Sequence, residues 1–214
     1  MSIQELNDIF TKYKCDKGSN VSRGHNYQLE YGKVLSKVRN EKINILEIGI
    51  WKGISMKCFH EYMPNAQLYG IDIFTRIEPE DVPILKLDRT HYIKGDSMSD
   101  DIVTKIKNEW GDIKFDIIID DGKHTPHANK MTFKNIMPFL KDNGIYYMED
   151  VFPMDSLNIQ EINNSFIRSH SNDLNISKFN DFLESISQYP YDRLDFRSNK
   201  TPIDSYIFKI RNKI

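Results

Sequence analysis

The sequence predicts an α/β protein with a doubly wound, mostly parallel sheet of seven strands, helices on both faces and a short helical segment at the N-terminus. Short apolar runs alternate with stretches in which apolar residues recur at helical spacing, between residues 43 and 150. Strands and helices in such alternation form a parallel sheet, because each crossover helix returns the chain to the same edge. A polar or glycine cluster ends each of these strands, which is typical of a ligand-binding edge.

The N-terminal region is expected to form two helices. Ile3, Leu6 and Phe10 recur at helical spacing and predict an amphipathic helix over residues 2–13. A polar, turn-rich stretch follows at residues 15–20, and a second helix is predicted over residues 27–38.

Five strands with crossover helices follow, and a less regular tail completes the sheet. The run from Ile117 to Ile119 has the continuous apolar character of an interior parallel strand. The predicted strands cover residues 43–49, 67–73, 90–96, 115–121, 144–150, 192–197 and 205–210. The predicted helices cover residues 55–62, 99–110, 130–140, 159–170 and 176–186.

The composition is that of one globular domain. The chain has 214 residues, 39% hydrophobic and 28% charged, which is enough to bury a core without disulfides or structural metal. Its net charge of -2 gives no basic field, so neither nucleic acid nor a membrane is expected as a partner. Cys15 and Cys58 lie outside any CxxC spacing and are expected to be free thiols in a reducing compartment. No apolar signal core or bilayer-long run occurs, so we expect a cytoplasmic protein.

Acidic residues and glycines gather where the predicted strands end. Ligands of open α/β sheets bind outside the carboxyl ends of the strands, so these side chains are expected to meet at one edge. Any one of them alone is explained by capping of the next helix, but capping does not readily explain all five strand ends. The five ends carry Glu47 and Gly49, Asp72, Gly95 and Asp96, Asp120 and Asp121, and Glu149 and Asp150.

The turn after the first strand indicates a cofactor site. Gly49 and Gly53 permit positive φ and close approach of the backbone to a ligand. Their spacing matches neither the dinucleotide GxGxxG nor a phosphate-binding P-loop. Asp72, about twenty positions on at the end of the second strand, is placed to hydrogen-bond ribose hydroxyls.

The segment Asp120-Asp121-Gly122-Lys123-His124 indicates metal and proton chemistry. Neighbouring carboxylates repel each other unless a cation or proton lies between them, and Mg²⁺ prefers oxygen ligands. We therefore expect Asp121, Glu149 and Asp150 to bind a divalent metal. His124 suits proton abstraction near neutral pH. For each residue taken singly, a solvated or helix-capping role is the better interpretation, and only their joint placement favours a site.

The first half of the domain resembles the class I methyltransferases, which have a Rossmann-like fold. The segment from Glu47 to Gly53 is similar to their motif I, Asp72 to their ribose-binding acid, and Gly95-Asp96-Ser97 to the turn that faces the adenine. The lack of a diphosphate-binding pattern favours S-adenosylmethionine over NAD or ATP, although a nucleotide-binding Rossmann-like enzyme stays an alternative. We place Asp120 on the cofactor side of the cleft or in the turn.

A closer resemblance is to the sugar O-methyltransferases of macrolide tailoring, of the mycinamicin and macrocin type. It rests on Asp120-Asp121-Gly-Xaa-His124, on the strand that ends in Glu149-Asp150, and on an upstream Asp16-Lys17-Gly18-Ser19 followed by His25, Tyr27 and Tyr31. The resemblance implies Mg²⁺ bound by Asp121, Glu149 and Asp150, with His124 as the base and Asp121 in the catalytic group. The chain departs from the family at Lys123, which is usually Ser, and at Asn143 before Gly144, which is usually Gly.

The resemblance also implies a domain organisation and a function. Residues 1–40 would form a helical segment over the cofactor cleft, contributing Lys17, Gly18, Ser19 and Tyr27, and residues 41–214 the Rossmann-like methyltransferase domain. The expected activity is Mg²⁺-assisted transfer of methyl from S-adenosylmethionine to a sugar hydroxyl, on a nucleotide-linked or capsular polysaccharide sugar. The alternatives are a catechol-type or other small-molecule methyltransferase and a non-catalytic nucleotide-binding module. A homo-oligomer is compatible with the sequence.

Overall fold

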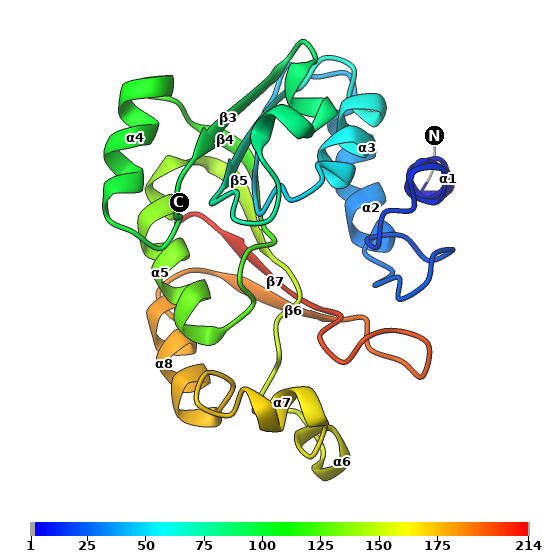
Figure 1. Ribbon diagram of the computed structural model, residues 1–214, viewed down its shortest axis with the longest axis vertical. Helices are drawn as coiled ribbons and strands as arrows, with labels where there is room; N and C mark the ends of the chain where they lie inside the picture. The colour runs from blue at the N-terminus through cyan, green and yellow to red at the C-terminus, as the bar shows by residue number, and fades with distance from the viewer. Residues whose placement is uncertain (1–2, 214) are drawn as a thin grey trace.

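A computed structural model describes residues 3–213 as a seven-stranded sheet between two layers of helices (Figure 1). The strand order is β3-β2-β1-β4-β5-β7-β6. The first five strands pair in parallel, whereas β7 runs antiparallel to both β5 and β6, so the sheet is mixed, as a mostly parallel prediction allows. The strands are β1 (Asn44–Ile48), β2 (Gln67–Asp72), β3 (Thr90–Lys94), β4 (Phe115–Asp120), β5 (Leu140–Met148), β6 (Tyr191–Asp195) and β7 (Tyr206–Arg211).

Alternation along the strands divides the apolar residues on the sheet into two clusters, one on each face. Ile117 and Ile119 of β4 pack on one face of the sheet, while Ile118 packs on the other. The first face is covered by α1 (Ile3–Tyr13), α2 (Gln28–Val38) and α3 (Ile54–Tyr62). The second face is covered by α4 (Asp101–Trp110), α5 (Pro126–Ile136) and α8 (Ile176–Ile186).

Several boundaries differ from the predicted ones, each for a local reason. The fifth helix begins at Pro126 instead of residue 130, because Thr125 accepts a hydrogen bond from the Ala128 N–H and proline suits the first turn. The helix predicted over 159–170 is two short helices, α6 (Ile159–Ile162) and α7 (Ser165–Ser169), because Asn158 and Asn164 each cap a new start. Three short 3₁₀ helices were not predicted: Pro79–Asp81, Pro83–Lys86 and Met137–Phe139.

The N-terminal helices are part of the first core cluster. α1 packs on α2 and α3, and Leu6 and Phe10 are fully buried. Ser2, where the first helix was expected to begin, lies outside the described residues. Cys15 and Cys58 are buried free thiols, as expected. Among residues 3–213, none of the helices combines the length and apolar character needed to span a bilayer.

Candidate active site at the carboxyl edge of the sheet

A cleft of about 780 Å³ lies along the carboxyl ends of β1 to β5. It extends from the turn after β1 and the end of β2, past the turn after β3, to the loop after β4 and the end of β5. Seven of the predicted site residues line it: Gly49, Asp72, Asp96, Ser97, Asp121, His124 and Asp150. The cleft therefore joins the predicted cofactor residues to the predicted metal and base residues in one cavity.

Asp72 fixes the shape of the end of the cleft where the cofactor is predicted to bind. One of its carboxylate oxygens accepts a hydrogen bond from the Trp51 N–H at 2.8 Å, and the other accepts from the Phe74 N–H at 2.6 Å. The turn after β1 is thereby tied to the end of β2. Across the cleft, the Asp96 carboxylate accepts from the Met98 N–H at 2.9 Å and closes the turn after β3. Both acids keep lone pairs that a ligand's hydroxyl or amino group can use.

Gly49 is required by packing against the loop after β4. Its φ is +89°, and a Cβ added there would lie 2.1 Å from the Asp121 carbonyl oxygen. The glycine was expected to let the backbone approach a ligand. The structure adds a close approach to the backbone of Asp121, so Gly49 joins the turn after β1 directly to the acidic end of the cleft.

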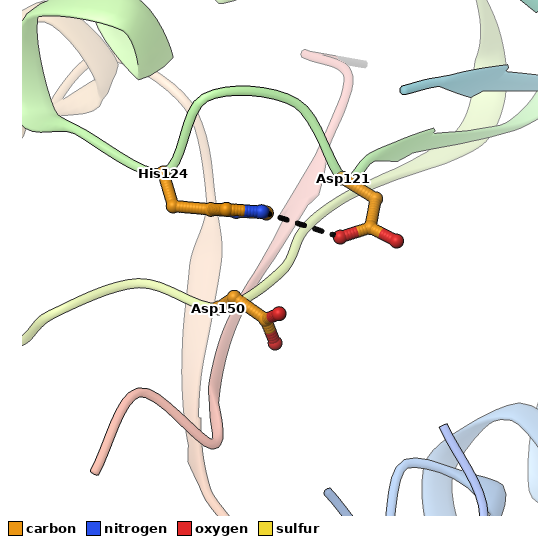
Figure 2. Close-up of side chains that lie close together, drawn as sticks. All are labelled: Asp121, His124 and Asp150. Atoms are coloured by element: carbon orange, nitrogen blue, oxygen red, sulfur yellow. Dashed lines mark ion pairs between the residues drawn. The ribbon is translucent and has the colours of Figure 1, made fainter. Parts of the chain in front are cut away.

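Asp121, His124 and Asp150 converge at the acidic end (Figure 2). One ligand atom from each lies within 4.8 Å of the others, and His124 Nε2 is 3.6 Å from Asp121 Oδ1. His124 and Asp150 have φ values of +55° and +52°, a left-handed conformation that costs a non-glycine residue about 1–3 kcal/mol. Two carboxylates and one imidazole at this separation fit a divalent cation.

The carboxylates of this group change the proton affinity of His124. Burial alone would lower the pKa of His124, but the carboxylates of Asp150 and Asp121 outweigh burial and raise the pKa above its usual value. Burial raises the pKa of Asp150 to about 7, against the pull of the His124 imidazole. Groups with perturbed pKa values in a cleft are typical of catalytic sites.

The segment between α1 and α2 supplies polar side chains to the same edge. The Lys17 ammonium donates to Asp121 Oδ2 at 2.6 Å and also to the Glu149 carboxylate. The Tyr27 hydroxyl donates to Asp150 Oδ1 at 2.6 Å. Glu149 accepts a further hydrogen bond from the Tyr31 hydroxyl, and it is not a member of the convergent group of Asp121, His124 and Asp150.

The remaining predicted site residues do not line the cleft, because strand alternation or local packing turns them away from it. Asp120 points to the face of the sheet that α4, α5 and α8 cover, where the Tyr146 hydroxyl donates a hydrogen bond to its carboxylate at 2.9 Å. Ser19 packs on α1 through two hydrogen bonds with Asn7. Gly53, which precedes the first residue of α3, packs against the Ile84 side chain. The eight residues set back from the cleft surface are Lys17, Gly18, Ser19, Tyr27, Glu47, Gly53, Asp120 and Glu149.

Several residues that line the cleft were not predicted as site residues, and most of them lie in loops outside the motifs. The loop after β2 contributes Thr75, Arg76 and Ile77, and the turn after β3 contributes Met98. Lys14, Cys15 and Asp16 come from the N-terminal segment. Lys123, the unexplained departure from the family pattern, also lines the cleft.

Comparisons with known proteins agree with this geometry. A family model described as a methyltransferase domain matches residues 46–151, which contain the five strand ends of the cleft. The chain is 27% identical over 155 residues to mycinamicin VI 2''-O-methyltransferase of Micromonospora griseorubida, covering 69% of this chain and 36% of that protein. It is 26% identical over 155 residues to demethylmacrocin O-methyltransferase of Streptomyces fradiae, with the same coverage.

Among solved structures, MycE methyltransferase of the mycinamycin pathway, in complex with Mg and SAH, is similar in fold. The TM-score is 0.65 with 20% identity, over 96% of this chain and 54% of that one. This chain thus spans 36% of the length of the curated relatives it matches. Residues 46–151 thus match a methyltransferase domain, and the chain resembles the class I, S-adenosylmethionine-dependent O-methyltransferases of the mycinamicin and macrocin type.

Proposed function

We propose that this chain transfers a methyl group from S-adenosylmethionine to a sugar hydroxyl, assisted by a divalent cation such as Mg²⁺. The observation that supports this most is the single cleft that connects Gly49, Asp72 and Asp96 with Asp121, His124 and Asp150. A cofactor bound along the first three residues would direct its methyl group toward the last three. Placing nucleophile and methyl in line accounts for much of the acceleration in such transfers.

At the cofactor end, Asp72 would accept hydrogen bonds from the ribose hydroxyls while keeping its backbone contacts to Trp51 and Phe74. Asp96 and Ser97 would face the adenine. Ser97 is held in place by a 2.9 Å hydrogen bond with the hydroxyl of Thr132, a residue of α5. Met98 lines the same part of the cleft and offers an apolar contact for the ring.

At the acidic end, Asp121 and Asp150 would hold the cation. The third protein ligand would be Glu149 according to the family resemblance, which leaves His124, the third member of the convergent group, free to act as the base. A bound divalent cation lowers the pKa of an acceptor hydroxyl that it contacts. As the base, His124 would accept the hydroxyl proton at Nε2 while the oxygen attacks the sulfonium methyl and S-adenosylhomocysteine leaves.

A sugar is favoured as the acceptor because of the relatives. Their names assign methyl transfer to mycinamicin VI, to demethylmacrocin and, at 29% identity, to L-olivosyl-oleandolide. These are small glycosylated molecules, and we extend the sugar hydroxyl, not the aglycone, to this chain. A nucleotide-linked sugar and a capsular polysaccharide sugar are both acceptors to be tested.

Calorimetry and turnover assays test this proposal. We expect S-adenosylmethionine and S-adenosylhomocysteine to bind, and methyl transfer to a panel of nucleotide-activated and free sugars to be lost in EDTA and restored by Mg²⁺. His124→Ala should abolish transfer and leave cofactor affinity near that of the wild type. Failure to bind either cofactor form would refute the proposal, and equal turnover in EDTA would remove the cation. Transfer to a catechol but to no sugar would favour a small-molecule methyltransferase.

A further inference from the structure

A second cavity, of about 560 Å³, lies between the loop that joins β6 to β7 and the segment that contains α6. Its volume falls within the range of about 300–1,000 Å³ that is common for small-molecule sites. The residues that line it differ from those that line the cofactor cleft. The cavity is therefore a separate site, to which the proposed methyl transfer assigns no role.

This cavity adjoins the acidic end of the cleft, because the loop between β6 and β7 is anchored there. The Phe196 ring packs on the Tyr27 ring with 5.4 Å between the ring centroids. The Tyr27 hydroxyl, which donates to Asp150, also lies 3.3 Å from the Asp204 carbonyl oxygen. In Figure 1 this loop extends past the sheet, between the α1–α2 connection and α6. An acceptor whose hydroxyl reaches His124 can therefore extend toward the cavity.

Arg197 is held rigidly in the wall of the cavity. Its Nε and Nη2 donate to the two carboxylate oxygens of Asp195 at 2.9 and 2.7 Å, and its side chain is 15% exposed. Its Nη1 is buried without a hydrogen-bond partner among residues 3–213, and Glu161 Oε1 is 3.6 Å from it. A buried donor without a partner points to an acceptor that the chain itself does not supply. One hydroxyl group can accept from Nη1 and donate to Glu161 at the same time.

The rest of the lining also matches hydroxyl groups. Four amide side chains line the cavity: Asn158, Gln160, Asn164 and Asn199. Each carboxamide offers donors and an acceptor together, which suits a ring that carries several hydroxyls. Pro202 and Ile203 add apolar surface for the C–H groups of such a ring.

The charges of the lining decide against a phosphate group. Glu161 and Asp195 each carry a negative charge and Arg197 carries one positive charge, so the charged side chains of the cavity leave one negative charge. A diphosphate would bring like charge into this partly desolvated space and be repelled. A neutral saccharide meets no such repulsion. The cavity therefore favours a second sugar residue over the nucleotide of a nucleotide-linked sugar.

We propose that this cavity is a subsite for the second sugar residue of the acceptor, so that the chain methylates a sugar within an oligosaccharide or polysaccharide. This inference rests on the proposed function, because it names the acceptor class of that site. The sugar that receives the methyl group lies at His124, and its neighbour lies in the cavity. A hydroxyl of that neighbour bridges Arg197 Nη1 and Glu161, which makes Arg197 a specificity-determining residue.

Binding to an array of immobilised glycans tests the inference without turnover. The full chain, with S-adenosylhomocysteine present, is applied to bacterial monosaccharides, disaccharides and tetrasaccharides. We expect at least one oligosaccharide to bind about tenfold or more tightly than the monosaccharide with the same terminal residue, because the second residue adds hydrogen bonds. UDP-linked and GDP-linked hexoses, added in solution, should compete no better than the free hexoses.

Substitutions in the cavity test its part in this binding. Asn199 is exposed and makes no side-chain hydrogen bond within residues 3–213, so Asn199→Trp fills the cavity while the ion pairs of Arg197 remain. It should weaken oligosaccharide binding by about tenfold or more, and Arg197→Gln should do the same, because each removes contacts to the second residue. In a transfer assay with an oligosaccharide, Arg197→Gln should raise KM more than it lowers kcat. Lys200→Trp is the matched control, since Lys200 is an exposed residue of the same loop outside the cavity lining, and its oligosaccharide binding should equal that of the wild type.

The outcomes separate this inference from the proposed function. If S-adenosylhomocysteine binds but no oligosaccharide binds more tightly than its terminal monosaccharide, the inference is overturned while the proposed function stands. Oligosaccharide binding that Asn199→Trp leaves intact would also overturn it, as would a nucleotide-linked hexose that displaces every oligosaccharide. If the wild type does not bind S-adenosylhomocysteine, the proposed function fails and the inference fails with it. Asn199→Trp decides the question even if Arg197→Gln does not fold.

Discussion

Substitution of Gly49 by alanine should damage both the fold and the cleft. The added Cβ would lie 2.1 Å from the Asp121 carbonyl oxygen, more than 1 Å inside ordinary van der Waals contact, at a φ of +89°. The backbone conformation costs an alanine about 1–3 kcal/mol, and forced overlap in a packed region costs about 1–3 kcal/mol more. We therefore expect a loss of about 2–6 kcal/mol in the free energy of unfolding.

The damage should also reach the ligand, because the overlap pushes the turn after β1 away from the loop after β4. A displacement of about 1 Å between groups that act together can cost about a hundredfold in activity. Urea unfolding followed by circular dichroism measures the stability, and calorimetric titration with S-adenosylhomocysteine measures the cofactor affinity. We expect affinity to fall by at least about tenfold.

Gly111→Ala is the matched control. Gly111 also has a positive φ, +67°, but a Cβ there would meet no atom within 4 Å. It therefore isolates the backbone cost, and cofactor affinity should not change. If the two alanine variants lose the same stability and both bind S-adenosylhomocysteine normally, the close approach of Gly49 to Asp121 does not constrain the site, and the reasoning is wrong.

Three further predictions concern buried titratable groups. Tyr146→Phe removes the hydrogen bond to buried Asp120 and should cost about 1–3 kcal/mol in urea unfolding at pH 7. Burial raises the pKa of Asp120 to about 6, so the stability that this carboxyl contributes is complete below pH 3.8 and is lost as pH rises through 6. Because Tyr146→Phe removes a hydrogen bond that lowers this pKa, the loss of stability should extend to higher pH in the variant. Burial likewise raises the pKa of Glu47 to about 8, although the Lys17 charge acts to lower it. The free energy of unfolding should therefore fall between pH 4.5 and 8, and Glu47→Gln should reduce that fall by at most about 5 kcal/mol. An unchanged slope of stability against pH would contradict this. His124 must be neutral to accept a proton, and its raised pKa should place the acidic limb of the kcat profile above pH 6.5; a limb at or below 6.5 would argue against His124 as the base.

Much of the fold follows from the sequence because it depends on local periodicity. The runs around Ile45, Ile71 and Ile118 are apolar on both faces, as interior parallel strands must be, and each was predicted within two residues of its observed bounds. Boundaries failed where capping decided them. Thr125 and Pro126 start α5 four residues before the apolar pattern does, and Asn164 divides one predicted helix in two.

The gathering of acids at one edge also follows from the sequence, since parallel strands bring their carboxyl ends together. The sequence did not determine which acid faces which partner. That depends on alternation at each strand end, on positive φ at His124 and Asp150, and on a lysine that lies 104 residues from Asp121 and 132 from Glu149. A motif specifies which residues are present at the edge, but contacts between distant segments arise only when the whole core packs. Tertiary structure therefore decided that Lys17 engages Glu149 while Asp121, His124 and Asp150 remain open to the cleft.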